Sequence, residues 1–123
     1  MRSHSPAVAE LTVYEKNTCT TCKSLALLLQ ERGIDFDAVE YHITGLREDE
    51  LRGLLAKAGA RPRDFLRARE ATAVGLDAES LDDDALIAEM VAHPALVQRP
   101  IVVRGDRAVL ARPVERVLEL LDD

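Results

Sequence analysis

Residues 12–24 read TVYEKNTCTTCKS, and the expected organisation of the chain follows from this stretch. The apolar run Leu11–Tyr14 predicts a β-strand, a polar loop follows it, and Ser24–Arg32 has the periodicity of a helix. Both cysteines of the chain, Cys19 and Cys22, lie at this joint with the spacing C-x-x-C. A C-x-x-C pair between a strand and a helix indicates a redox-active dithiol.

A cysteine at the N-terminus of a helix faces unpaired backbone N–H groups and the positive end of the helix dipole. Because these groups stabilise the thiolate, they lower the pKa of the cysteine. Cys19 lies closer to the expected helix start, so we expect it to be the attacking sulfur. Cys22 lies one turn inside, where it should be more buried and could resolve an adduct on Cys19.

The cysteine pair could also have one of two different roles. A C-x-x-C pair is half of a zinc site, but zinc needs four ligands. The remaining candidates, His4, His42 and His93, do not have ligand spacing. The cysteines could instead be two unreactive core side chains. We expect no metal and no bound cofactor.

The composition predicts one globular domain at residues 11–123. Hydrophobic residues make up 47% of the 123 residues and aromatic residues only 3%, so aliphatic side chains must fill the core. The chain has no apolar run long enough to span a membrane, and Met1–Glu10 lacks the apolar stretch of a signal peptide. We expect residues 1–10 to be a flexible tail and the location to be cytoplasmic, where two cysteines favour catalysis over a structural disulfide. The net charge of −6 argues against direct binding of nucleic acid.

Apolar periodicity and turn residues predict the other elements. They are a strand at Ile34–Tyr41, helices at Arg47–Ala58, Arg61–Arg69 and from Asp82 to about Ala92, a hairpin of Arg99–Val103 and Ala108–Leu110, and a helix opened by Pro113. The expected fold is α/β, with a thioredoxin-like mixed four-stranded sheet. Its core would comprise residues 11–43 and 98–123, with a helical insertion at about 44–97. In such folds the proline that opens the third strand is often cis and faces the reactive cysteine, and Pro100 has this position.

The chain resembles the glutaredoxin-coupled arsenate reductase (ArsC) family, and the related Spx group, over Leu11–Leu121. The motifs that carry the resemblance are Tyr14 with Cys19 five residues on, Phe65-Leu66-Arg67, His93-Pro94, Gln98-Arg99-Pro100-Ile101-Val102-Val103 and Ala111-Arg112-Pro113. The resemblance implies that Cys19 is the nucleophile and that, by position, Arg67, Arg99 and Arg112 bind the oxyanion. Guanidinium groups match a tetrahedral oxyanion and would reduce its repulsion of a thiolate. An isolated arginine such as Arg67 is otherwise more often a solvated surface residue.

Two positions depart from the family pattern. Cys22 stands where glutaredoxin-coupled members usually have serine, so the electron donor could be thioredoxin rather than glutathione with glutaredoxin. Glu15 stands where the family has histidine. A carboxylate near Cys19 would raise its pKa, and Lys16 and Lys23 would oppose that effect.

The expected function is therefore a thiol-dependent arsenate reductase that converts arsenate to arsenite through a covalent Cys19–arsenate adduct, with Cys22 as resolving thiol. The alternatives are an Spx-like redox-sensing regulator that binds RNA polymerase, and a thiol reductase of unknown substrate. Spx-like chains generally lack the Arg112-Pro113 pair before the last helix, so this pair favours the enzyme. Neither nucleic acid nor a membrane is an expected direct partner.

Overall fold

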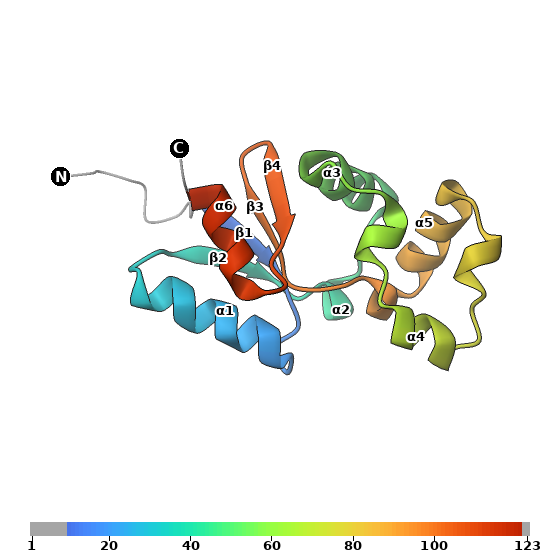
Figure 1. Ribbon diagram of the computed structural model, residues 1–123, viewed down its shortest axis with the longest axis horizontal. Coiled ribbons are helices and arrows are strands. Elements are labelled where there is room, and N and C mark those ends of the chain that lie inside the picture. The colour runs from blue at the N-terminus through green and yellow to red at the C-terminus, as the bar shows by residue number, and fades with distance from the viewer. Residues whose placement is uncertain (1–9, 122–123) are drawn as a thin grey trace.

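The computed structural model describes residues 10–121 and contains a mixed four-stranded sheet with helices on both faces (Figure 1). The sheet order is β2-β1-β3-β4. Its strands are β1 Leu11–Tyr14, β2 Phe36–Val39, β3 Ile101–Arg104 and β4 Arg107–Leu110. β1 and β2 are parallel, and β3 is antiparallel to both β1 and β4. This is the α/β, thioredoxin-like arrangement predicted from the sequence. The predicted tail, residues 1–10, lies outside the described residues except for Glu10.

One face of the sheet packs against α1, Thr20–Glu31, and α6, Leu118–Leu121. The inward side chains of β1, Leu11 and Val13, are fully buried there with Leu25 and Leu29 of α1. The strand residues that alternate with them point to the opposite face. α1 begins before the predicted Ser24 because Cys19 caps it, so both cysteines belong to the helix start.

A series of helices joins β2 to β3. They are α2 Tyr41–Thr44, α3 Glu48–Ala58, η1 Pro62–Phe65, α4 Ala68–Ala73, η2 Ala78–Ser80, α5 Asp83–Ala92 and η3 Pro94–Leu96. In Figure 1, α4 and α5 lie at the opposite end of the molecule from α1. Leucines of α3 and apolar residues of α5 form a second buried cluster, which also contains Ile101 of β3. α3 ends at Gly59, whose φ of 62° is left-handed.

The second strand is shorter than predicted. The alternation in Ile34–Tyr41 predicted a strand to Tyr41, whereas β2 ends at Val39 and Tyr41 begins α2. The arginine-dense segment is also two elements, because the backbone of Leu66 pairs with Val97 and interrupts the helix. Pro113 precedes a 3-10 turn, η4 Val114–Val117, before α6.

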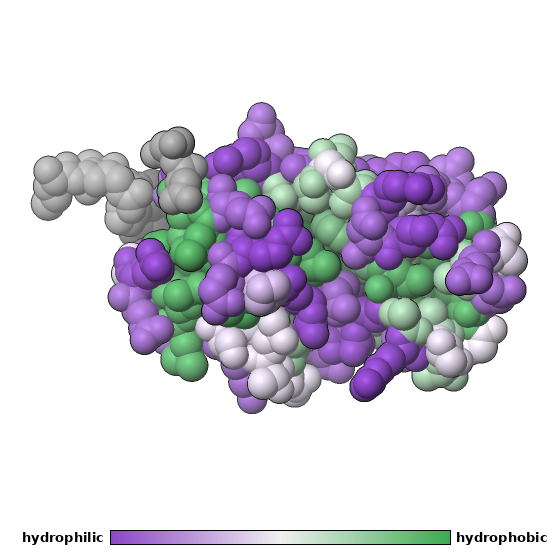
Figure 2. All heavy atoms as spheres, viewed as in Figure 1, coloured by the Kyte–Doolittle hydropathy of each residue, from purple (hydrophilic) through white to green (hydrophobic). Residues whose placement is uncertain are grey.

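Hydrophilic side chains cover most of the face seen in Figure 2, with apolar groups visible between them. The large hydrophobic side chains that are exposed among the described residues are Leu27, Ile43 and Val74. No helix among residues 10–121 has both the length and the apolar character that crossing a membrane requires.

Candidate active site

Cys19 is the N-cap residue of α1. Its backbone is extended, with φ −78° and ψ 125°, and its Sγ accepts a hydrogen bond from the backbone N–H of Cys22 at 3.4 Å. The Cys19 side chain is partly exposed, and both cysteines are free thiols. A capping sulfur receives the unpaired N–H groups of the first turn, which favour its thiolate form.

The surroundings of Cys19 lower its pKa. Burial alone would raise the pKa, but hydrogen bonds from the side chain and the backbone of Cys22, together with the Arg99 guanidinium, outweigh that effect. The thiolate is the nucleophilic form of cysteine. Cys19 is therefore activated in the sense that its position in the sequence predicted.

Cys22 has the opposite environment. Its residue is only 2% exposed, and burial is the largest cause that raises its pKa to about 12. The backbone of Lys16 acts in the opposite direction, whereas the hydrogen bond to Cys19 and the charges of Cys19 and Glu15 raise the pKa further. The pair thus combines an activated thiol at the helix start with a protonated thiol beneath it.

Glu15 acts on the pKa of Cys22 and is not one of the main influences on the pKa of Cys19. Glu15 follows β1, and its backbone N–H donates to the carbonyl of Val39 at 2.9 Å. Glu15 and Glu40 therefore both lie at the carboxyl end of the parallel strand pair β1–β2. Burial and the neighbouring charge of Glu40 raise the pKa of Glu15. The main causes acting on the pKa of Cys19 are burial, Cys22 and Arg99, and their net effect lowers it, contrary to the deactivation expected from this carboxylate.

Two of the predicted arginines lie in adjoining loops. Arg99 precedes Pro100 and Arg112 precedes Pro113, and both of these peptide bonds are cis. The Nη1 of Arg112 donates to the carbonyl oxygen of Arg99 at 2.9 Å. Arg99 in turn acts on Cys19 by a hydrogen bond and by its charge. The structure therefore joins Cys19, Arg99 and Arg112 in one chain of contacts.

Arg67, the third predicted arginine, is the N-cap residue of α4. Its Nη1 donates to the carbonyl of Ala95 at 3.4 Å and lies 3.7 Å from the Glu70 carboxylate. Its charge acts on the hydroxyl of Tyr41, on which Arg99 also acts. Arg67 and Arg99 thus both act on the Tyr41 hydroxyl, whereas the direct contacts of the Arg67 guanidinium are with Ala95 and Glu70.

Tyr41 also interacts with the predicted arginines, although the sequence pattern did not predict it as a residue of this site. It is 1% exposed, and its hydroxyl donates to the carbonyl of Val97 at 2.5 Å. Burial raises the pKa of Tyr41 to about 12, although Arg99 and Arg67 act to lower it. The prediction that Tyr41 belongs to the second strand gave no indication of its buried position or of its partner Val97. The signal that could have found it is the break in alternation at Val39–Tyr41, which marks the end of the strand.

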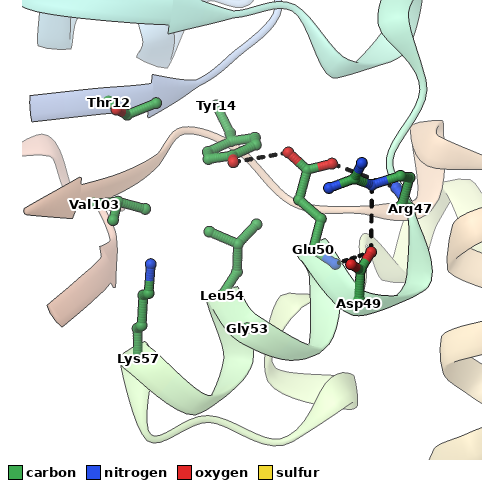
Figure 3. Close-up of a pocket in the computed structure, with 9 residues that line it drawn as sticks. All are labelled: Thr12, Tyr14, Arg47, Asp49, Glu50, Gly53, Leu54, Lys57 and Val103. Atoms are coloured by element: carbon green, nitrogen blue, oxygen red, sulfur yellow. Dashed lines mark hydrogen bonds and ion pairs between the residues drawn. The ribbon is translucent and has the colours of Figure 1, made fainter. Parts of the chain in front are cut away.

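A separate pocket of about 420 Å³ lies between the sheet and α3 (Figure 3). Tyr14 points into it and donates to Oε2 of Glu50 at 2.8 Å. The other lining residues are Thr12, Arg47, Asp49, Gly53, Leu54, Lys57 and Val103. None of the predicted site residues lines this pocket. Within residues 10–121, no group of three histidine, cysteine or acidic side chains is arranged to hold a metal.

The fold and site define a thioredoxin-like protein with an activated cysteine beside arginine side chains. The sequence model of the ArsC family matches residues 14–120, and the chain belongs to that family. An arsenate reductase of Neisseria meningitidis is 34% identical over 115 residues, which cover 91% of this chain and 98% of the relative. An arsenate reductase of Escherichia coli K12 is 34% identical over 118 residues, covering 94% and 84%. The solved structure of an arsenate reductase from Vibrio cholerae has a TM-score of 0.79 and 32% identity, covering 90% of this chain and 97% of that one.

Proposed function

We propose that the protein is a thiol-dependent arsenate reductase that forms a covalent Cys19–arsenate adduct and releases arsenite. The observation that carries the proposal is the lowered pKa of Cys19 beside the Arg99 guanidinium. The 34% identity to arsenate reductases supports arsenate as the oxyanion. The thiolate is the nucleophilic form of cysteine, and guanidinium groups beside it favour the binding of an anionic substrate such as arsenate.

In the first step, the Cys19 thiolate attacks the arsenic atom of arsenate. A sulfur–arsenic bond forms, one arsenic–oxygen bond breaks, and the oxygen leaves as water after taking up protons from solvent. Arg99, Arg112 and Arg67 serve as oxyanion-binding residues in this proposal. Their charges reduce the repulsion between the thiolate and arsenate and stabilise charge on the arsenate oxygens.

In the second step, Cys22 gives up its proton to solvent and its sulfur attacks Sγ of Cys19. The sulfur–arsenic bond breaks, and its electron pair stays on arsenic, which leaves as arsenite while the cysteines become a disulfide. The negative charge of Cys19, one cause of the high pKa of Cys22, is absent from the adduct.

A donor thiol must then reduce the disulfide. Thioredoxin can do so by thiol–disulfide exchange, and glutathione with glutaredoxin is the other donor system we consider. Glutathione can also take the place of Cys22 and attack the adduct directly. Either donor requires a reducing compartment, and we place the reaction in the cytoplasm.

The unequal thiols also favour a second candidate, an Spx-like redox regulator. A low-pKa, partly exposed cysteine with a resolving cysteine one turn away is the arrangement of a disulfide switch. Under this alternative the protein would co-purify with RNA polymerase and would not turn over arsenate.

The test is arsenite production by the purified protein, measured with glutathione and glutaredoxin and, separately, with thioredoxin and its reductase. We expect turnover with at least one donor system and none with Cys19→Ser. Absence of arsenite with both systems would reject the arsenate reductase. Full activity of Cys19→Ser would reject Cys19 as the nucleophile.

A further inference from the structure

We propose that the hydroxyl of Tyr41 is a positioning group that holds the Arg99 guanidinium against Cys19. The inference rests on the proposed function because it concerns the cysteine that attacks arsenate. Tyr41 itself would touch neither arsenate nor arsenic. It would act only through Arg99.

The first observation is the way in which Tyr41 is fixed. The side chain is 1% exposed within the cluster of buried residues that includes Leu96, Val97 and Ile101. Its hydroxyl proton is used in the hydrogen bond to the carbonyl of Val97, two residues before Arg99. Tyr41 therefore holds the segment that leads into Arg99 and has no spare proton to donate.

The second observation is that Arg99 is held by its backbone but not fully by its side chain. Its carbonyl accepts from Arg112 at 2.9 Å, and the adjacent residue Gln98 donates its N–H to the carbonyl of Phe65 at 2.7 Å. The Nε of Arg99, in contrast, is buried without a hydrogen-bond partner among the described residues. The orientation of the guanidinium must therefore come from the groups that face its other nitrogens.

Two side chains interact with the Arg99 guanidinium. The Arg99 guanidinium lowers the pKa of Cys19 by a hydrogen bond and by charge, and it acts on Tyr41 in the same two ways. A hydroxyl has one proton and two acceptor lone pairs. Since the proton of Tyr41 goes to Val97, its lone pairs are available to Arg99. The guanidinium thus interacts with both a neutral oxygen and the attacking sulfur.

A neutral acceptor suits this position better than a carboxylate. Burial raises the pKa of Tyr41 to about 12, so the hydroxyl stays uncharged throughout the neutral range. An uncharged oxygen can orient a guanidinium without neutralising it, whereas a carboxylate would form an ion pair and weaken its effect on Cys19. Tyr41 therefore leaves the positive charge of Arg99 available to the thiolate and to an oxyanion.

The test is Tyr41→Phe, which keeps the ring and removes the acceptor. The rate of iodoacetamide alkylation of Cys19 is measured against pH, with the labelled residue identified by peptide mass spectrometry. We expect the midpoint to move up by about one pH unit, which lowers the alkylation rate about tenfold below the midpoint. An unchanged midpoint in Tyr41→Phe would overturn the inference.

Tyr14→Phe is the matched control. Tyr14 also loses one hydroxyl hydrogen bond, to Glu50, in the pocket shown in Figure 3. It should leave the midpoint of Cys19 unchanged, and an equal shift in both variants would overturn the inference. Thermal unfolding of the two variants is compared so that a general loss of stability is recognised.

Arg99→Ala separates positioning from a direct effect of Tyr41. In that background we expect Tyr41→Phe to cause no further shift of the Cys19 midpoint, because no guanidinium is left to position. A full additional shift would overturn the inference. The alkylation assay contains no arsenate, so failure of the proposed function appears only in the arsenite assay and failure of the positioning role only here.

Discussion

Sγ of Cys19 accepts a hydrogen bond from the backbone N–H of Cys22 at 3.4 Å, which places the two thiols on the same first turn of α1 in unequal environments. The hydrogen bonds lower the pKa of Cys19, whereas burial raises that of Cys22 to about 12. At neutral pH the outer sulfur is favoured as the attacking group and the inner one stays protonated. In the proposed function, this difference determines the order in which the two cysteines react.

Cys22→Ser should change the dependence on the electron donor. Without the inner thiol, no internal disulfide can form, so we expect thioredoxin to support less than about a tenth of wild-type turnover, by the logic of thiol–disulfide exchange. Glutathione with glutaredoxin should still support turnover, because glutathione can attack the adduct on Cys19 directly. The measurement is arsenite produced per minute with each donor system.

Cys22→Ala is the matched control for the Cys22→Ser variant, since serine can hydrogen bond to Cys19 and alanine cannot. Both variants should lose thioredoxin-dependent turnover to the same extent. Wild-type rates with thioredoxin in both would show that Cys22 is not the resolving thiol.

Arg112→Ala should reduce kcat/KM for arsenate about a hundredfold, equivalent to about 3 kcal/mol, a usual effect of removing one electrostatic donor from such a site. In the proposed function, this loss of kcat/KM has two physical causes. The variant loses one oxyanion-binding charge, and the carbonyl of Arg99 loses its 2.9 Å donor. Steady-state kinetics with varied arsenate measure the change.

Arg116→Ala is the matched control for Arg112→Ala. Arg116 is also an exposed arginine of the same segment, but it pairs with Glu119 at 3.1 Å. We expect its kcat/KM to stay within about twofold of wild type, since exposed ion pairs contribute little. Equal losses in the two variants would contradict the assignment of Arg112.

Local patterns were sufficient to predict most of the fold. The apolar run of β1, the Asp82 cap of α5 and the hairpin around Gly105 depend on residues close in sequence, and each element lies where it was predicted. The prediction of one short helix over Arg61–Arg69 was wrong in its continuity, because a tertiary contact divides the segment into η1 and α4. The backbone pairing of Leu66 with Val97 joins residues far apart in sequence.

The distance in sequence between partners also decides what could be predicted of the site. The C-x-x-C spacing and the helix start predicted the contrast between Cys19 and Cys22, because both residues belong to one local element. The placement of Tyr41 depends on Val97, a partner more than fifty residues away. An alternating apolar pattern does not reveal such a partner, so Tyr41 was assigned to the strand instead.

Asp82→Ala should lower the free energy of unfolding by about 1 kcal/mol, the usual effect of removing an N-cap side chain. Oδ1 of Asp82 accepts from the backbone N–H of Ala85 at 2.8 Å, and α5 packs its apolar side into the core. Urea unfolding measures the change. Asp35→Ala, at an exposed loop position, removes the same charge and should leave stability within about 0.5 kcal/mol of wild type. Equal stability of both variants would contradict a capping role for Asp82.

Glu15→Gln should speed the resolving step, because the negative charge of Glu15 is one of the causes that raise the pKa of Cys22. The sign follows directly: neutral glutamine lowers the pKa of Cys22, so more thiolate exists at a given pH. Since the pKa of Glu15 is itself raised, the two proteins should converge at acidic pH, where the wild-type carboxyl is also uncharged. The measurement is the rate at which Cys22 closes on a mixed disulfide at Cys19, followed against pH. Glu31→Gln, an equal charge change at the exposed far end of α1, should leave this rate unchanged, and a slower or unchanged rate in Glu15→Gln would show that the charge of Glu15 does not govern Cys22.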